Sequence, residues 1–209
     1  MEIETKRFLL RDFIESDRAA FLAYQADPRN LTFYNPNESN PFREASLQEN
    51  RAARLFELFQ TWADERPRLN YQLAIVQRQS PHALVGCGGL RTINNTTNEM
   101  ELGIELAPTY WGSYAYAIET GVALLEFGFR ELKLETISGS TVSANAKIAR
   151  LAEWAGAEIV TICPGESWLS ERGWSEVKWR MTRSQWEVRK RLNGSRLLTI
   201  YLNIKSSSD

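Results

Sequence analysis

The feature that most constrains the fold is a strand that leads through one short loop into a helix, over residues 99–129. Residues 99–106, "EMELGIEL", alternate strictly between apolar and mostly acidic side chains, which is the period of a β-strand. Pro108 ends this strand, "WGSYAYA" follows as a loop, and a helical pattern begins around Tyr116. Apolar residues recur there at steps of four, three and four: Ile118, Val122, Leu125 and Phe129.

The rest of the chain reads as helices and strands on either side of this unit. Strands are expected near Phe8 and over 71–76, 84–93, 134–142, 158–163, 175–182 and 197–204. Helices are expected after Ser16–Asp17, over 44–64, from Asn145 to Gly156 and around Trp186. The early strands read as an antiparallel meander, whereas strand–helix–strand units in the middle favour parallel pairing. We expect an α/β fold with a mixed sheet and helices on both faces.

Composition excludes several classes of function. The 209 residues carry a net charge of −1, so no bulk attraction to nucleic acid or to an anionic membrane is expected. No apolar run approaches the ~20 residues of a membrane span, and the charged N-terminus does not resemble a signal peptide. The single histidine, His82, rules out multi-histidine metal sites. Cys87 and Cys163 have no metal spacing, which is typical of reduced thiols in a cytoplasmic protein.

Two parts of the strand–loop–helix unit have both a structural and a functional interpretation. The acidic face of the strand (Glu99, Glu101 and Glu105) is either a solvated edge or one wall of a cleft. The loop is either a tight turn or a cradle for phosphate, because the N–H groups and the positive dipole at a helix N-terminus favour anions. The loop has no lysine and no G-x-x-x-x-G-K-[ST] pattern, so it is not a nucleoside-triphosphate P-loop.

In its order of motifs the chain resembles the GNAT N-acetyltransferase superfamily, in particular the branch of ribosomal-protein N-terminal acetyltransferases (RimJ/RimL type). That branch carries E-[IL]-G on a strand and then L-x-P-x-Y-W-G-x-G-Y-A-x-E. The matching segments are Glu101–Gly103, Leu106–Gly112 and Tyr116–Glu119, and the later N-x-x-S…E-x-x-G-F element matches Asn145, Glu153 and Gly156. The likeness extends to about residue 187, so we expect a GNAT domain over 1–187 and an extension over 188–209.

The resemblance implies an enzyme that transfers an acetyl group from acetyl-CoA to a primary amine by direct attack. The coenzyme would lie in a V-shaped opening between two splayed parallel strands, 99–106 and 134–142. The residues implied in its binding are Leu102, Gly103, Ile104, Leu106, Trp111, Gly112, Ser113, Tyr114, Ala115, Tyr116, Ala117 and Asn145. Asn145 is otherwise a plain helix cap. Glu101 is the expected general base and Glu105 the second choice, because the attacking amine must lose a proton.

The chain departs from the family pattern at several positions. The loop is one residue longer, and the second glycine becomes Ala115 or Tyr114; the Cβ of such a residue disfavours positive φ. The serine of N-x-x-S is Ile148, and the tyrosine that serves as general acid in other branches falls at Ala152. The substitutes for that acid are Tyr110, Tyr114 and Ser143; alternatively the thiolate leaves unaided, since a thiol pKa lies near 8.5.

The extension and the acceptor leave alternatives open. Residues 197–204 alternate like an apolar strand, which pairs either within its own chain or in a homodimer. The acceptor is a protein N-terminus or a small-molecule amine, and the acidic face of the strand suits a cationic one. The alternative function is that of a GNAT-like protein that binds acyl-CoA or a protein partner with little or no transferase activity.

Overall fold

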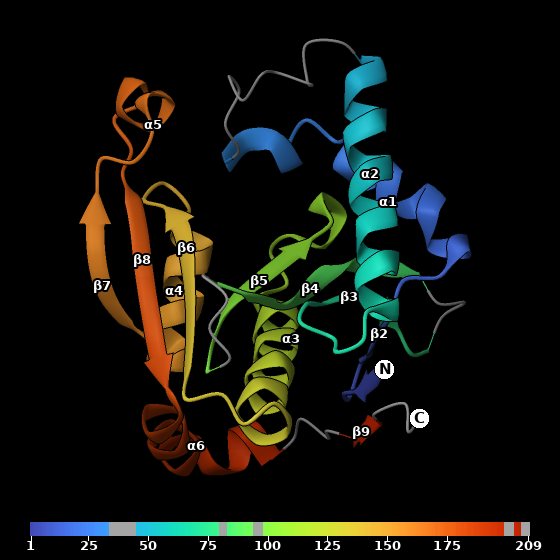
Figure 1. Ribbon diagram of the computed structural model, residues 1–209. Helices are drawn as coiled ribbons and strands as arrows, with labels where there is room; N and C mark the ends of the chain where they lie inside the picture. Colours follow the sequence, from blue (N-terminus) through green and yellow to red (C-terminus); the bar gives the residue numbers. More distant parts are fainter. Residues whose placement is uncertain (34–44, 80–82, 94–97, 199–202, 206–209) are drawn as a thin grey trace.

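The computed structural model describes residues 1–33, 45–79, 83–93, 98–198 and 203–205. The strands are β1 (Glu2–Glu4), β2 (Phe8–Arg11), β3 (Tyr71–Gln77), β4 (Leu84–Thr92), β5 (Glu99–Leu106), β6 (Thr136–Val142), β7 (Glu158–Cys163), β8 (Glu176–Thr182) and β9 (Asn203–Lys205). The α-helices are α1 (Arg18–Gln25), α2 (Ala45–Asp64), α3 (Tyr114–Glu126), α4 (Ala146–Ala155), α5 (Ser167–Glu171) and α6 (Arg183–Leu198). All the strands belong to one sheet of order β7-β8-β6-β5-β4-β3-β2-β1-β9 (Figure 1).

The mixed α/β fold expected from the sequence is confirmed, and β1 and α5 are additions to it. Helix α3 begins at Tyr114, two residues before the expected start. Helix α6 runs to Leu198 and crosses residue 187 without a break, so the strand expected from residue 197 is wrong at its start. Residues 199–202 and His82 lie outside the described residues, and the domain boundary after 187 stays a prediction. Strand β9 pairs antiparallel with β1 of the same chain.

The sheet has one short parallel pairing, between β5 and β6. Only three residue pairs form it, from Glu99↔Thr136 to Glu101↔Ser138. Beyond them β5 stays paired with β4 up to Leu106, and β6 stays paired with β8 up to Val142. The two halves of the sheet therefore diverge from this ladder, as Figure 1 shows. The expected V-shaped opening between the two strands is confirmed.

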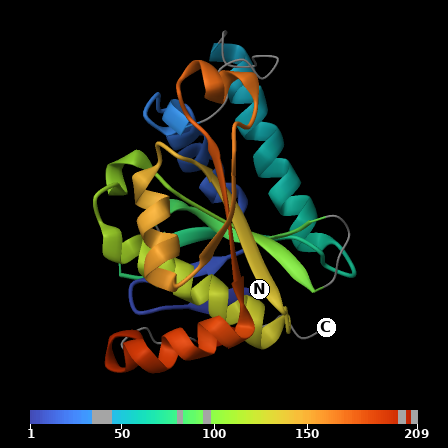
Figure 2. The ribbon, with the colours of Figure 1, turned by 90° about the vertical axis from the view of Figure 1, so that its left-hand side faces the viewer.

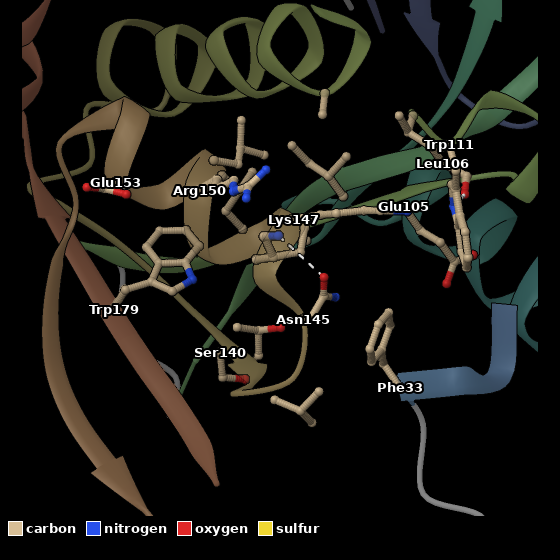
Figure 3. A pocket seen from close by; sticks show the side chains of 18 of the residues that line it. Phe33, Glu105, Leu106, Trp111, Ser140, Asn145, Lys147, Arg150, Glu153 and Trp179 are labelled. Carbon is tan, nitrogen blue, oxygen red and sulfur yellow. Dashed lines mark hydrogen bonds between the residues drawn. The ribbon is translucent and has the colours of Figure 1, made fainter. Parts of the chain in front are cut away.

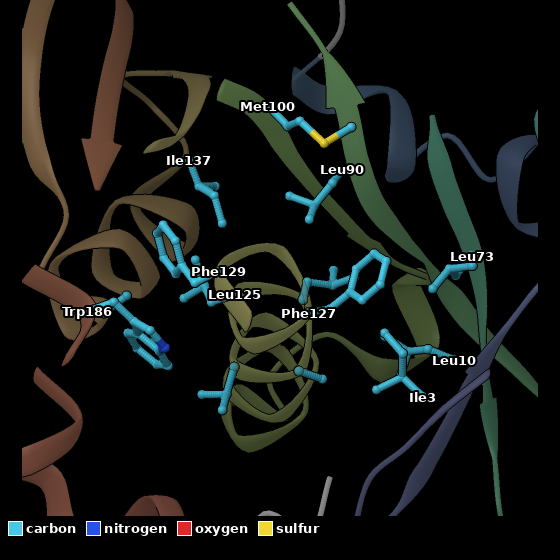
Figure 4. Close-up of a cluster of buried hydrophobic side chains, with 14 of the residues drawn as sticks. Ile3, Leu10, Leu73, Leu90, Met100, Leu125, Phe127, Phe129, Ile137 and Trp186 are labelled. Atoms are coloured by element: carbon cyan, nitrogen blue, oxygen red, sulfur yellow. The ribbon is translucent and has the colours of Figure 1, made fainter. Parts of the chain in front are cut away.

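Helices cover both faces of the sheet. On one face α1 and α2 bury an aromatic cluster that includes Phe21 and Phe56, which are both fully buried. On the other face α3 packs its apolar side on β3, β4 and β6 (Figure 4), where Leu90 and Ile137 are fully buried. Figure 2 shows α3 and α4 on the opposite side of the sheet from α2. The opening between β5 and β6 therefore connects two differently covered faces.

Two buried carboxylates fix α3 against the ends of the chain. Glu119, 2% exposed, accepts hydrogen bonds from Thr5 Oγ1 at 2.6 Å and from the amide N and the Nε of Arg7 at 2.7 and 2.6 Å. Glu126 accepts the indole N–H of Trp186 at 2.7 Å and pairs with Lys190. Buried charges are stable when their hydrogen bonds are satisfied in this way, and removing a partner is costly. Helix α3 is thereby tied to the turn between β1 and β2 through Glu119 and to α6 through Glu126.

A glycine in β6 makes room for a tryptophan beside the opening. Gly139 pairs with Trp179 of β8, and a Cβ on Gly139 would lie 2.2 Å from Cζ2 of that ring. Trp179 is 8% exposed, and no hydrogen-bond partner is found for its indole N–H within the described chain. Since no hydrogen bond holds the ring, packing over Gly139 determines where it lies.

We predict that Gly139→Ala lowers the free energy of unfolding by about 1–3 kcal/mol, because the new methyl group displaces the Trp179 ring. Urea denaturation measures this cost. The same substitution in a Trp179→Ala background should cost at least about 1 kcal/mol less, because the clash is gone. An equal cost in both backgrounds would contradict the packing described for Gly139.

Cys87 lies in the core between β4 and α1, where it accepts a hydrogen bond from the Tyr24 hydroxyl at 3.3 Å. Burial, and after it the charge of Glu105, raises the pKa of the Cys87 thiol from 9.0 to about 12. Cys163 is partly exposed, and both cysteines are free thiols. Cys87 is therefore a protonated, structural thiol at neutral pH rather than a nucleophile.

The raised pKa of Cys87 predicts that the protein loses stability in mild alkali. Between pH 9 and 12 the unfolded thiol has lost its proton and the folded one has kept it, so the free energy of unfolding falls as pH rises. We expect a slope of about 1 kcal/mol per pH unit near pH 9.5. Urea denaturation between pH 8 and 10 should show this slope in the Cys163→Ala control but a clearly flatter one in Cys87→Ala. The same slope in both variants would argue against burial of the thiol.

Candidate active site

A cavity of about 1140 Å³ occupies the opening between β5 and β6 (Figure 3). On the face of α3 and α4 it is lined by Leu102, Ile104 and Leu106 of β5 and by Ile148 of α4. On the face of α1 and α2 it is lined by Glu101 and Glu105 of β5, Arg91 of β4 and Ser140 of β6. Small-molecule sites commonly measure 300–1,000 Å³. The cavity can hold a large ligand that passes from one face of the sheet to the other.

Most residues that the sequence singled out meet in this cavity. Its lining includes Glu101, Leu102, Gly103, Ile104, Glu105, Leu106, Trp111, Gly112, Ser113, Tyr114, Ala117 and Asn145. Ala115 and Tyr116 are outside this lining, and their expected part in coenzyme binding stays a prediction. The ring of Tyr116 packs edge-on against Phe8 of β2, with centroids 4.9 Å apart.

The wide end of the opening contains the N-terminus of α3 and its loop. Gly112 has φ +95°, a conformation that suits glycine, and nothing approaches its missing side chain within 4 Å. Within the described residues the amide N–H groups of Gly112 and Ala115 have no backbone acceptor, whereas that of Tyr114 bonds to the Gly112 carbonyl. Ala115 is helical, so the family's second glycine can be absent without backbone strain. Free N–H donors at a helix N-terminus favour an anion.

Two cations of α4 face this wide end, and sequence reasoning missed both. Lys147 places its Nζ 4.5 Å from the centroid of the Trp111 ring, and Arg150 lines the cavity one turn further along the helix. The Tyr114 hydroxyl donates to the Arg150 carbonyl at 2.9 Å, and the indole of Trp111 donates to the Leu106 carbonyl at 2.7 Å. These contacts join α4 to the loop and to the end of β5. The sequence signal was weak, being only the spacing of two cations after a capping asparagine.

Asn145 begins α4 as its N-cap residue. Its Oδ1 accepts the amide N–H of Ile148 at 3.4 Å, and Gly156 ends the helix with φ +86°, so both expected helix signals are confirmed. The side chain also lines the cavity (Figure 3). The capping bond engages its oxygen, so the amide NH₂ remains as a donor towards a ligand.

The opposite face of the opening carries the two candidate bases. Glu101 Oε2 lies 3.5 Å from Nη2 of Arg91, and Glu101 Oε1 accepts a hydrogen bond from Ser140 Oγ at 3.4 Å. Glu105 accepts a short hydrogen bond from Gln25 of α1. The acidic face of β5 therefore forms a wall of the cavity rather than a solvated edge. Electrostatically the opening is polar, with cations of α4 on one face and carboxylates of β5 on the other.

The three candidate general acids differ in whether they line the cavity and in what they contact. Tyr110 lines the cavity, whereas Ser143 is outside its lining and accepts the amide N–H of Ser175 at 3.0 Å. Tyr114 is bonded to α4 at the wide end, and partial burial raises its pKa above the usual 10. Its hydroxyl therefore stays protonated but is engaged away from the ladder.

No three His, Cys, Asp or Glu side chains of the described ranges come together where they could hold a metal ion. No helix in the same ranges combines the length and the apolar character that crossing a membrane requires.

Solved structures share this fold at low sequence identity. An acetyltransferase of the GNAT family from Bacillus anthracis aligns with a TM-score of 0.66 and 20% identity, over 88% of this chain and 99% of that one. A ribosomal-protein-S5-alanine acetyltransferase from Vibrio fischeri aligns with a TM-score of 0.66 and 16% identity, over 89% and 98%. A chimeric spermidine N-acetyltransferase from Vibrio cholerae and hSSAT gives 0.66 and 18%, over 86% and 98%.

The family comparison agrees with the geometry of the opening. The model of the acetyltransferase (GNAT) domain matches residues 7–158, which is most of the chain and includes β5, the loop, α3, β6 and α4. The chain therefore belongs to the GNAT family of N-acetyltransferases.

Proposed function

We propose that this protein is an acetyl-CoA-dependent N-acetyltransferase of the RimJ/RimL-like branch, which transfers the acetyl group to a primary amine by direct attack. One observation carries the proposal: the cavity passes through the sheet between β5 and β6, with a helix N-terminus that has free N–H donors on one face and carboxylates on the other. Such an opening allows a phosphate-bearing donor and an amine to approach each other from opposite faces.

The residues present fit acetyl-CoA. The free amides of Gly112 and Ala115, with Lys147 and Arg150, would hold its phosphates at the wide end. From there the pantetheine arm would follow β5 along Leu102–Leu106, whose edge facing β6 has no strand partner beyond Glu101. The thioester would then lie near the ladder, close to Glu101. Acetyl-CoA supplies the activated acyl group, and all other roles belong to the chain.

The chemistry then requires one proton acceptor. Glu101 takes a proton from the ammonium form of the acceptor, directly or through water, and the free amine nitrogen attacks the thioester carbonyl carbon. The C–N bond forms as the C–S bond breaks, the electron pair leaves with the sulfur as a thiolate, and the proton lost by the new amide nitrogen passes to that thiolate, directly or through water. Backbone N–H groups of the open β5 edge stabilise the carbonyl oxygen. Glu105 is the second candidate for the base.

A second candidate function is binding of acyl-CoA without transfer. It is supported by Ala152 at the position of the family's acid and by the bond that holds Tyr114 to the Arg150 carbonyl. The two functions share the coenzyme site and differ in whether thiol is released in the presence of an amine.

Binding of acetyl-CoA is predicted to raise the melting temperature by about 5–10 °C at 100 times the dissociation constant, because that excess adds about 2.7 kcal/mol to the free energy of unfolding. Differential scanning fluorimetry with acetyl-CoA tests this. Acetyl-pantetheine, which lacks the phosphates and the nucleotide, should give a much smaller shift. If acetyl-CoA at millimolar concentration gives no shift, both candidate functions are wrong.

Lys147→Ala should weaken acetyl-CoA binding about 5- to 20-fold at low salt, since it removes one cation from the wide end. Calorimetric titration at two salt concentrations measures the loss, which should shrink at high salt. Lys178→Ala is the matched control, because this lysine lies outside the cavity lining and pairs with Glu176. Equal effects of the two variants would remove Lys147 from the phosphate site.

Glu101→Gln should lower kcat/KM about 10²- to 10⁴-fold while acetyl-CoA binding is kept, because the amide keeps the shape of the side chain but accepts no proton. Thiol release in a panel of amines measures activity. Glu99→Gln is the matched control on the same face of β5, outside the cavity lining. Loss of activity in Glu105→Gln instead would make Glu105 the base.

A further inference from the structure

We propose that the acceptor is an amine with a carboxylate beside it, that is an α-amino acid, and that Arg91 binds this carboxylate. The inference rests on the proposed function and adds the acceptor's chemical class. It differs from the expectation of a purely cationic acceptor, which followed from the acidic residues of β5 alone. The observation behind it is a cation in the middle of that acidic face.

Arg91 reaches this place through the register of β4 and β5. Arg91 pairs directly with Glu101, and Gly103 comes two residues later on the same face of β5. A Cβ built on Gly103 would lie 3.0 Å from Nη2 of Arg91, so the guanidinium extends over this glycine. Glu101 and Glu105 precede and follow Gly103 on the same face. The guanidinium therefore lies between the two candidate bases and lines the cavity.

The guanidinium has donors that the protein does not use. Among the described residues its ion pair is the 3.5 Å contact with Glu101, which is long for a hydrogen bond between charged groups. Its Nε is buried and has no hydrogen-bond partner there, while the side chain as a whole is 40% exposed. An arginine presents five N–H donors in a planar fork that matches a carboxylate. The buried Nε cannot reach a ligand, but the exposed end of the guanidinium lines the cavity and is available to an anionic group on the ligand.

The spacing of charges selects an amino acid among anionic ligands. Nη2 of Arg91 and Oε2 of Glu101 are 3.5 Å apart, so the groups they bind must be close neighbours in the ligand. An α-amino acid meets this condition because its ammonium and carboxylate are attached to one carbon. Its ammonium would face Glu101 or Glu105, and its carboxylate would face Arg91. A polyamine offers no partner for Arg91 and would be repelled by it at this distance.

The alternative role of Arg91 is only to hold the Glu101 carboxylate in position, which would affect every acceptor equally. A matched pair of acceptors separates the two roles. An amino acid and its carboxamide share the amine and the side chain and differ in the carboxylate. Carboxylate recognition changes the ratio of their kcat/KM values, whereas an effect on the base leaves that ratio unchanged.

The test measures thiol release from acetyl-CoA with the twenty L-amino acids, spermidine, and the carboxamide of the best amino acid. The wild-type protein should prefer an amino acid to its carboxamide and to spermidine. Arg91→Met, which keeps the aliphatic stem, should lower the acid-to-amide ratio of kcat/KM about 10- to 100-fold, and Arg91→Lys should lower it less. Arg130→Met is the control: Arg130 lies outside the cavity lining, and its ratio should equal that of the wild type.

Each outcome has a defined meaning. A preference for spermidine, or an acid-to-amide ratio that Arg91→Met leaves unchanged, overturns the inference while the N-acetyltransferase stands. Acetyl-CoA binding without thiol release from any acceptor of this panel overturns the inference, whereas acyl transfer is overturned only if a peptide with a free N-terminus also releases no thiol. If Arg91→Met does not fold, Arg91→Lys carries the test, because it preserves the charge and loses the fork; an unchanged ratio in that variant also overturns the inference.

Discussion

The site depends on a parallel ladder of only three residue pairs between β5 and β6. Each strand keeps a full antiparallel partner on its outer side, so the divergence leaves open only the two inner edges. Unpaired backbone groups are tolerated where water or a ligand satisfies them. The inner edge of β5 thus offers backbone hydrogen-bonding groups along the proposed path of the pantetheine arm. No separate loop is needed to bind that arm. A longer ladder would close the cavity, and a shorter one would separate the two halves of the sheet.

The ladder is useful only because α3 holds its N-terminus at the wide end. Glu119 and Glu126 are buried on this helix, and each is bonded to an element distant in sequence, β1–β2 in one case and α6 in the other. Glu119 belongs to the segment that resembles the family motif, yet its side chain is outside the cavity lining and its role is structural. Its function in the fold is to fix the direction of the helix whose free amides form the proposed anion site. A motif residue can therefore be needed for a site that it does not touch.

Much of this arrangement could be predicted from the sequence where the signal was local. The period of 99–106, the cap at Asn145 and the stop at Gly156 each depend on a few neighbouring residues, and all three are confirmed. The start of α3 and the end of α6 were missed, because Tyr116 packs on Phe8 and Trp186 on Glu126 across long stretches of chain. Arg91, Lys147 and Trp179 were missed for the same reason. Their places follow from strand register and helix packing, which no local pattern encodes.

The charges that line the opening differ from those expected from the acidic strand alone. Seen as sequence, Glu99, Glu101 and Glu105 suggest a surface for cations. In the fold, Gly103 lets Arg91 lie among them, and Gln25 engages Glu105 from α1. The wall is thus a set of alternating charges with a cation at its centre, and the glycine of the E-[IL]-G element, Gly103, leaves room for that cation. Because an ammonium and a carboxylate on one carbon match such alternation, the acceptor that we propose rests on the register of β4 against β5, which places Arg91 opposite Glu101.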